Sequence, residues 1–237
     1  MRRAGTVLRD LFEELGSKVI RPGVSTGELD AYIEKYIRDR GCRPSFKNLY
    51  GFPASACISV NDEVVHGIPG KRVLQEGDVV KVDVGAALGG LHADAARSFP
   101  VGKVDPEAAK LLEVTQAALE AGLAQAKVGN RVSDISSAVQ TVAEKAGYSV
   151  VRQYVGHGVG RKLHEDPQVP NYVYPGLRDV RLRAGMTLAI EPMLNVGSFE
   201  VVVAQDKWTV RTADGKLSAN FEDTVAVTEA GPYILTR

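Results

Sequence analysis

Two aspartates, Asp83 and Asp94, stand among valines, alanines and glycines in the segment KVDVGAALGGLHADAARS, residues 81 to 98. The segment predicts a β-hairpin, and a turn about Leu88 and Gly89 would set the two aspartates directly opposite each other, with Cβ atoms about 5 Å apart. Strand alternation sends the valines at positions 80, 82 and 84 into the core and Asp83 to the other face. Two carboxylates this close repel unless one is protonated or a cation lies between them.

Two further acids occupy the same kind of position. In GMTLAIEPM, Glu191 follows an apolar strand that Pro192 ends. In SANFEDTVAVT, Glu222 lies on the face opposite Phe221 and the following valines. No cluster of Lys or Arg in the sequence accompanies these acids to neutralise them. Because divalent cations supply that charge compactly, four acids and one imidazole suit two metal ions that share carboxylates and activate a water.

The sequence has four histidines, His66, His92, His157 and His164. Two of them lie in GHGVGRKLHEDP, where the glycines should leave the backbone around His157 free to bend and to approach a ligand closely. The spacing matches neither the dinucleotide-binding G-x-G-x-x-G motif nor the zinc motif H-E-x-x-H. For His66 a structural and a functional role remain equally open. For His92 we favour a structural role, because the metal ligand set is complete without it.

Other reactive residue types give weaker evidence of a catalytic role. We expect Cys57 to be a small buried residue rather than a nucleophile, because nothing near it in the sequence would lower its pKa. The only tryptophan, Trp208, is of a type found more often in a core than in a pocket. The serine-hydrolase motif G-x-S-x-G is absent, so the sequence does not support that class.

Composition excludes several classes of protein. The 237 residues are 44% hydrophobic, which is ordinary for a globular protein. Because 29 basic residues balance 29 acidic ones, the chain lacks the net positive charge that is typical of nucleic-acid binders. The two cysteines form no Cys-x-x-Cys pair, which is typical of a reduced protein. Charged residues interrupt the N-terminal segment MRRAGTVLRDLFEEL, so it lacks the continuous apolar stretch of a signal peptide. No apolar segment of the sequence reaches the length of a membrane span. We therefore expect a cytoplasmic protein with no specific nucleic-acid or membrane partner.

The helical patterns occur twice. Apolar residues at three- and four-residue steps from Val7 to Val19 predict one helix, and a capping box at Ser25 and Glu28 opens a second that ends near Gly41. About 106 positions later, a helix over 106–126 precedes another that ends at Gly147. The repeat indicates two similar halves about a pseudo-twofold axis, with a site where they meet. Because no linker divides the chain, we expect residues 1–237 to form a single α+β domain.

Strands follow the helices in each half. The predicted strands cover 79–84 and 91–99 in the first half, and 186–190, 201–204, 208–212 and 217–227 in the second. Asp214 and Gly215 predict a two-residue hairpin turn between the last two strands. This hairpin would bring Trp208 beside Phe221 and near Glu222.

Six segments occur in the order and spacing of type I methionine aminopeptidases, which the chain resembles over nearly its whole length: NDEVVHGIPG, GDVVKVDVGA, GLHADAARSF, GHGVGRKLHEDP, GMTLAIEPM and SANFEDTVAVT. The resemblance implies the pita-bread fold, in which two pseudo-twofold-related halves surround a central antiparallel sheet. It implies a metal-dependent hydrolase that removes the N-terminal methionine from nascent proteins and peptides with a small second residue. It makes the following residues ligands of two divalent ions of cobalt, manganese, iron or zinc: Asp83, Asp94, His157, Glu191 and Glu222.

The resemblance also implies roles around the metals. His164 would hydrogen-bond the scissile carbonyl or the tetrahedral intermediate, His66 would position the substrate amide, and Glu191 would shuttle a proton while it remains a ligand. The positions that match the methionine pocket are Leu49, Phe52, Cys57, Leu163 and Trp208. Leu49 and Leu163 replace aromatic residues that many relatives carry. Asp223 stands where a histidine is common, and the sequence offers no explanation for it.

The implied partners are the N-termini of nascent polypeptides, with transient ribosome contact, and we expect a monomer. One alternative is a pita-bread peptidase that cleaves beside proline, although such relatives usually carry an additional N-terminal domain. Another is a non-catalytic binding module of the same fold. Such modules typically lose metal ligands, whereas this sequence keeps all five.

Overall fold

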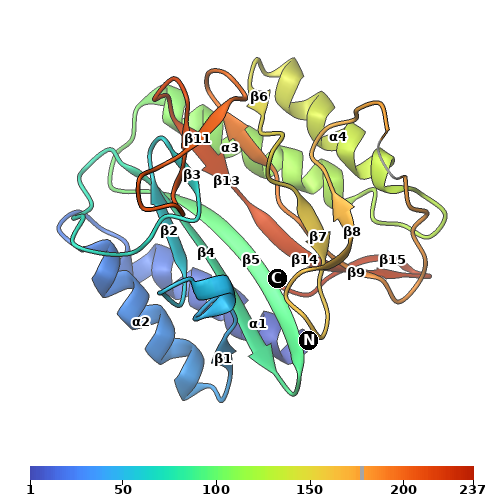
Figure 1. The fold of residues 1–237 in the computed structure, drawn as a ribbon, viewed down its shortest axis with the longest axis horizontal. Coiled ribbons are helices and arrows are strands. Elements are labelled where there is room, and N and C mark those ends of the chain that lie inside the picture. The colour runs from blue at the N-terminus through green and yellow to red at the C-terminus, as the bar shows by residue number, and fades with distance from the viewer. Residues whose placement is uncertain (177–178) are drawn as a thin grey trace.

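The computed structural model describes residues 1–176 and 179–237 and folds them into helices on curved antiparallel sheets (Figure 1). The helices are α1 (Arg2–Glu14), α2 (Thr26–Asp39), α3 (Pro106–Leu123) and α4 (Val132–Lys145), and a π-helical turn, η1 (Leu15–Val19), continues α1. The first-half strands are β1 (Arg43–Pro44), β2 (Cys57–Val60), β3 (Glu63–Val65), β4 (Val79–Leu88) and β5 (Leu91–Pro100), with a 3₁₀ turn, η2 (Leu49–Gly51), between β1 and β2.

The second half contributes more and shorter strands. They are β6 (Ser149–Val150), β7 (Gly156–Gly158), β8 (Glu165–Val169), β9 (Thr187–Ile190), β10 (Met193–Asn195), β11 (Val201–Val203), β12 (Val210–Thr212), β13 (Ser218–Asn220), β14 (Glu222–Thr228) and β15 (Gly231–Ile234). The central sheet has the order β1-β4-β5-β14-β9-β7-β8, with β2 added beside β4 and β15 beside β14. Strands β5 and β14 join the two halves at its centre.

The repeat seen in the sequence has a structural counterpart. Helix α2 begins with a capping box, in which the Glu28 carboxylate accepts a 2.8 Å hydrogen bond from Ser25 N. The start of α4, 106 residues on, has half of this device: Asp134 accepts a 2.7 Å bond from Arg131 N, but the Arg131 side chain has no acceptor with which to complete the box. Glycines in the left-handed region follow both helices: Gly41 (φ +71°) and Gly147 (φ +87°). The predicted α+β class with two similar halves is confirmed.

Each half has its own apolar core, and these cores fix the faces of the strands. Helices α1 and α2 lie with β4 and β5 in Figure 1, and between them the side chains of Val80, Val82 and Val84 are fully buried. Because side chains alternate along a strand, Asp83 must face away from this core. The same logic applies to β14, where Val225 and Val227 enter the second core and leave Glu222 on the opposite face.

The predicted register of the β4–β5 hairpin is wrong by two residues. The turn lies at Gly89 and Gly90, so Asp83 pairs with Ala96, and Asp94 pairs with Gly85. Both turn glycines have positive φ, +60° and +78°, as a two-residue hairpin turn requires, whereas Leu88 would be strained there. A shift of two residues keeps the same faces, so the aspartates remain on one face as diagonal neighbours.

The predicted hairpin at Asp214 and Gly215 is also wrong. Strand β12 pairs with β11 and β3, whereas β13 pairs with β10. The predicted strand over 217–227 is interrupted at Phe221, which separates β13 and β14 into different sheets. Phe221 enters the second-half core, and Trp208 contacts Phe52 of the first half instead. Tertiary pairing with distant strands overrides the local turn signal here.

Candidate metal centre and substrate cavity

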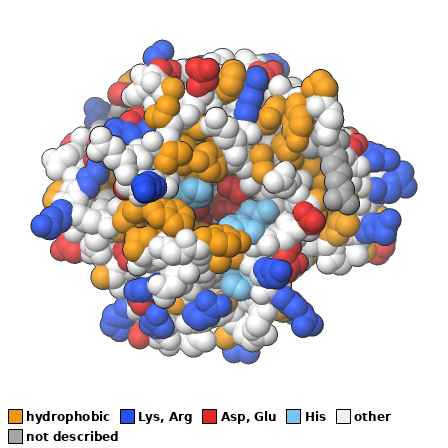
Figure 2. All heavy atoms as spheres, in the orientation of Figure 1, with side chains coloured by type: hydrophobic (Ala, Val, Ile, Leu, Met, Phe, Trp, Pro, Cys, Tyr) orange, Lys and Arg blue, Asp and Glu red, His pale blue; other side chains and the backbone are white. Residues whose placement is uncertain are grey.

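A cavity of about 970 Å³ opens between the two halves. In Figure 2 acidic side chains lie at the bottom of a hollow, histidines stand at its rim, and hydrophobic side chains surround it. Every site residue predicted from the sequence lines this cavity: Leu49, Phe52, Cys57, His66, Asp83, Asp94, His157, Leu163, His164, Glu191, Trp208 and Glu222. The fold therefore brings together residues that are spread over more than 170 positions of the chain.

The acids form overlapping groups at the bottom of the cavity. Ligand atoms of Asp83, Asp94 and Glu222 lie within 4.8 Å of one another, and so do those of His157, Glu191 and Glu222. Glu222 belongs to both groups, so its carboxylate lies where two ions could share it. Asp94 and Glu222 are almost completely buried. A lone acid on a strand is usually exposed to solvent, and these two acids are not.

The backbone around His157 sets the chemistry of its ring. Nδ1 lies 2.8 Å from the carbonyl oxygen of Gly158, and a carbonyl can only accept a hydrogen bond. Nδ1 therefore carries the proton, and Nε2 presents its lone pair to the acids, 3.7 Å from Asp94 Oδ2 and 3.7 Å from Glu191 Oε1. This arrangement is typical of a metal-ligating histidine.

The glycines beside His157 have a role in strand packing that the sequence did not predict. A Cβ at Gly156 would lie 2.4 Å from Ala189 O on β9, and a Cβ at Gly158 would lie 2.3 Å from Asp166 O on β8. Neither glycine has a positive φ. They are required because β7 runs closely between two neighbouring strands, and the β7–β8 register also shifts between His157 and Gly158.

Burial controls the electrostatics of the acids. It raises the pKa of Asp83, Glu191 and Glu222 well above their usual values and that of Asp94 to about 7, and neighbouring carboxylates raise the first three further. Within the described parts of the chain, no Lys or Arg forms an ion pair with these four acids. Burial also lowers the pKa of His157 to about 4, so its imidazole is neutral at pH 7.

The donor atoms fit divalent metal ions. Three buried carboxylate oxygens, Asp83 Oδ1, Asp94 Oδ1 and Glu222 Oε1, have no hydrogen-bond partner among residues 1–176 and 179–237. Buried acceptors are rarely left without a partner, and a cation would satisfy all three. Carboxylate oxygens with one neutral imidazole suit manganese, iron, cobalt or zinc.

An apolar pocket adjoins the acids. Its wall is an aromatic and aliphatic cluster that includes Leu49, Phe52, Cys57, Leu163 and Trp208. The rings of Phe52 and Trp208 meet edge to face with centroids 5.2 Å apart. Cys57 is buried, and burial raises the pKa of its thiol well above the usual value, so it is a wall residue and not a thiolate nucleophile. Trp208 lines the cavity, contrary to the general expectation of a core position.

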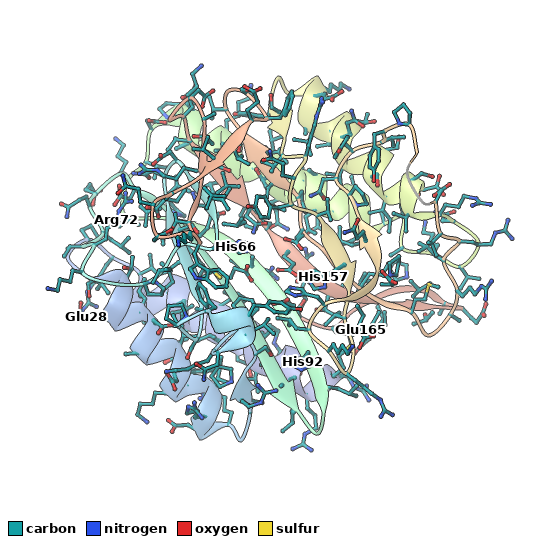
Figure 3. The ribbon with its side chains drawn as sticks, in the orientation of Figure 1. Glu28, His66, Arg72, His92, His157 and Glu165 are labelled. Carbon is teal, nitrogen blue, oxygen red and sulfur yellow. The ribbon has the colours of Figure 1, made fainter. Side chains whose placement is uncertain are left out.

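The other histidines divide between the cavity and the scaffold. His66 follows β3 with φ +59°, an uncommon conformation for a residue other than glycine, and it meets Tyr154 edge to face. His164 contacts the His157 ring edge to face, with centroids 4.5 Å apart. His92, labelled below His157 in Figure 3, does not line the cavity, and its Nδ1 is 2.8 Å from Ser45 Oγ. The structural role predicted for His92 is consistent with this position outside the cavity.

Two tyrosines of the cavity were missed by the sequence reasoning. Tyr154 lies beside His66, and Tyr50 stacks parallel to the His164 ring with centroids 6.1 Å apart. Tyr50 is 77% exposed and has φ +51°, although it is an aromatic residue. Its position between Leu49 and Phe52, both predicted pocket residues, was the available signal.

Comparison with known proteins agrees with this geometry. A model of metallopeptidase family M24 matches residues 1–229. The chain is 54% identical to a methionine aminopeptidase of Clostridium perfringens over 236 residues, which cover 100% of this chain and 94% of the relative. It is 54% identical to methionine aminopeptidase 1 of Bacillus subtilis, with 100% of this chain and 95% of the relative covered.

A solved structure is similar over the same extent. The crystal structure of a methionine aminopeptidase from Thermotoga maritima superposes with a TM-score of 0.96 at 45% identity and covers 100% of this chain and 95% of that one. The fold is therefore the pita-bread fold that the motifs implied. The protein belongs to metallopeptidase family M24, within its type I methionine aminopeptidase branch.

Proposed function

We propose that the protein is a metal-dependent hydrolase that removes the N-terminal methionine from nascent proteins and peptides whose second residue is small. The observation that carries this proposal is the junction of two environments in one cavity. Buried acids with a neutral imidazole adjoin an apolar aromatic pocket that suits the thioether side chain of methionine. Membership of the methionine aminopeptidase branch supports the same activity.

The residues that would hold two divalent ions are Asp83, Asp94, His157, Glu191 and Glu222. When bound, the ions would neutralise these carboxylates and supply a hydroxide nucleophile at neutral pH by lowering the pKa of a water. Arg161 and Lys162 also line the cavity, but within the described residues no Lys or Arg forms an ion pair with these four acids. Cobalt, manganese, iron and zinc all remain candidates.

The chain's own residues would position the substrate and move its proton. Leu49, Phe52, Cys57, Leu163 and Trp208 would enclose the methionine side chain and exclude water from it. His66, whose pKa burial lowers to about 4, would be neutral and able to donate its ring N–H to the substrate amide or accept from it. His164, whose pKa burial also lowers, would donate to the scissile carbonyl oxygen as negative charge develops there.

Glu191 would act as the proton carrier. Burial and the nearby Asp83 and Asp94 raise the pKa of its carboxyl well above the usual value. As a carboxylate beside the reacting water, Glu191 would accept a proton from that water and return it to the departing amine. Its position beside Nε2 of His157 keeps it next to the proposed metal ligands.

Hydrolysis of Met-Ala-Ser tests the proposal. Metal-stripped protein should be inactive, and reloading with each of the four ions in turn should restore turnover and rank them. Asp94→Asn should stay inactive after reloading, because it removes a ligand charge. Cleavage of Met-Ala-Ser with Met-Arg-Ser spared would support the preference for a small second residue, whereas equal turnover would contradict it.

The alternatives are tested in the same assay. Turnover of Xaa-Pro substrates in place of Met-Ala-Ser would indicate the proline-directed peptidase. Failure to bind any divalent ion would indicate the non-catalytic module.

We further propose that the protein works in the cytoplasm as a monomer and contacts the ribosome transiently, as the substrates of its branch imply. No helix in the two described stretches is long and apolar enough to cross a membrane.

A further inference from the structure

Asp223 is a fully buried acid that does not line the cavity. It follows Glu222 directly, and strand alternation turns its side chain to the opposite face of β14. An acid is almost never fully buried unless it is paired, so its partners define its role.

Three donors from two separate segments hold the Asp223 carboxylate. Arg97 Nη2 on β5 and the Thr236 hydroxyl each bind Oδ1 at 2.6 Å, and Arg237 Nε binds Oδ2 at 2.7 Å. Arg237 also forms a 2.6 Å ion pair with Glu120 on α3. Charge-assisted bonds of this kind are among the strongest that side chains make, so Asp223 joins β5, β14 and the segment after β15 rigidly.

The same partners also bind the backbone on both sides of Asp223. Arg97 Nη1 donates to the carbonyl oxygen of Glu222 and, at 2.8 Å, to that of Ala96. The Thr236 hydroxyl accepts a 3.2 Å bond from Thr224 N. The peptide groups that precede and follow Asp223 are therefore fixed by the residues that neutralise it.

Thr224 carries these contacts to a second acid of the cavity. Its hydroxyl donates to Asp94 O at 2.7 Å and accepts from Asp94 N at 2.9 Å. One side chain thus binds both polar backbone groups of Asp94. The network ends at the backbone of Glu222 from the second half and of Asp94 from the first.

We propose that Asp223, with Arg97, Thr236 and Arg237, is a positioning residue that fixes Glu222 and Asp94 at the separation needed to bind metal. The inference rests on the proposed function, because it takes these two residues as ligands. Groups that orient metal ligands typically change metal affinity 10- to 100-fold when they are removed. Asp223 does not line the cavity, and its partners bind the backbone of the residues on both sides of it.

Two variants test the proposal, and they differ in how much of the Asp223 network they remove. Asp223→Asn keeps the shape and removes the charge, and Thr236→Val keeps the shape and removes one hydroxyl. We expect the Mn²⁺ dissociation constant of the metal-stripped, folded protein, measured by titration calorimetry, to rise about 10- to 100-fold in Asp223→Asn and about 3- to 10-fold in Thr236→Val. At saturating Mn²⁺, KM for Met-Ala-Ser should change little.

Thr115→Val is the matched control. Thr115 is equally buried, and its hydroxyl bonds Leu111 O at 2.7 Å within α3, away from the cavity. We expect Thr115→Val to lower the unfolding temperature and to leave the Mn²⁺ dissociation constant unchanged. If the Asp223 network is purely structural, Asp223→Asn and Thr236→Val should behave in the same way. If Asp223→Asn does not fold, the test rests on Thr236→Val. A Mn²⁺ dissociation constant of Thr236→Val that is no larger than that of Thr115→Val would then overturn the proposal.

Glu222→Gln separates this inference from the proposed function. If Glu222→Gln binds Mn²⁺ as tightly as the native protein, the proposed ligand set is wrong. If Glu222→Gln weakens binding while Asp223→Asn and Thr236→Val bind normally, the ligand set stands and the positioning role is wrong.

Discussion

At the scale of single residues, burial decides what the acids and histidines of the cavity can do. Glu222 is 1% exposed and Asp94 is 2% exposed, and both have a raised pKa because their charged forms lose solvent. The same burial keeps His157 neutral. Burial therefore keeps the imidazole in the neutral form that binds a metal, whereas it disfavours the charged carboxylates, which need a nearby cation to keep their negative charge.

His164 should contribute to turnover and not to metal affinity. We expect His164→Ala to lower kcat for Met-Ala-Ser about 100-fold, because it removes a donor to the developing oxyanion. Its Mn²⁺ dissociation constant should match that of the native protein. A tenfold larger dissociation constant would instead indicate that His164 is a metal ligand. Its ring lies close enough to Asp94 and His157 to share an ion with them.

Trp208 should contribute to methionine binding. Trp208→Ala opens the wall that Trp208 forms with Phe52 and should lower kcat/KM for Met-Ala-Ser about 10- to 100-fold, which corresponds to roughly 1.5–3 kcal/mol of lost apolar contact. Tyr233→Ala is the control, because Tyr233 is an aromatic residue on β15 outside the cavity. Equal kinetic effects of the two substitutions would exclude a specific pocket role for Trp208.

At the scale of elements, one ionic cluster ties the pocket turn to the helix beneath it. The Glu34 carboxylate on α2 accepts a 2.6 Å hydrogen bond from Lys47 and a 3.0 Å bond from Ser55. Lys47 and Ser55 flank the segment that carries Leu49 and Phe52. The segment has little regular structure of its own, so these contacts help to hold it against α2.

Glu34 should make stability depend on pH below its ordinary pKa. The bond from Lys47 is the largest cause that lowers the pKa of Glu34 from 4.5 to about 2. Between these values the unfolded chain binds more protons, so this contribution is complete above pH 4.5 and is lost as pH falls towards 2. We expect about 1 kcal/mol, because Lys47 is partly exposed and solvent screens the pair.

Urea unfolding of metal-stripped Glu34→Gln and native protein checks this expectation. The variant should be less stable by about 1 kcal/mol at pH 6, and the difference should shrink as the pH approaches 2.5. The buried acids of the cavity titrate in both proteins and cancel in the difference. A difference that stays constant across this range would show that the Glu34 charge contributes nothing.

At the scale of the whole molecule, the proposed metal site joins the two halves. Asp83 and Asp94 lie on β4 and β5 of the first half, whereas His157, Glu191 and Glu222 come from the second. A ligand set divided in this way exists only when both halves are folded and docked. Metal binding should therefore stabilise the whole native state and not one half alone.

Thermal unfolding should show this coupling. Mn²⁺ at 100 times its dissociation constant should add about 2.7 kcal/mol of stability and raise the unfolding temperature by roughly 5–10 °C in one transition. Asp94→Asn should show little increase at the same Mn²⁺ concentration. Two transitions, only one of them sensitive to Mn²⁺, would contradict coupling between the halves.

The local features and the residue types of the site could be predicted from the sequence. Alternation placed the valines of β4 in the core and Asp83 on the other face, and the capping box at Ser25 and Glu28 formed as predicted. These features depend on neighbours within about four residues, which the sequence displays directly. The site residues predicted from the motifs all line the cavity, whereas Tyr50 and Tyr154 line it without having been predicted.

Features that depend on distant partners became visible only in the folded chain. The folded structure set the β4–β5 register through the positive φ of Gly89 and Gly90, and it placed β12 beside β3 rather than beside β13. It explained Asp223, whose partners Arg97 and Arg237 lie 126 and 14 positions away. Strand pairing, burial and ion pairing are contacts between segments far apart in the chain, so local pattern alone could not specify them.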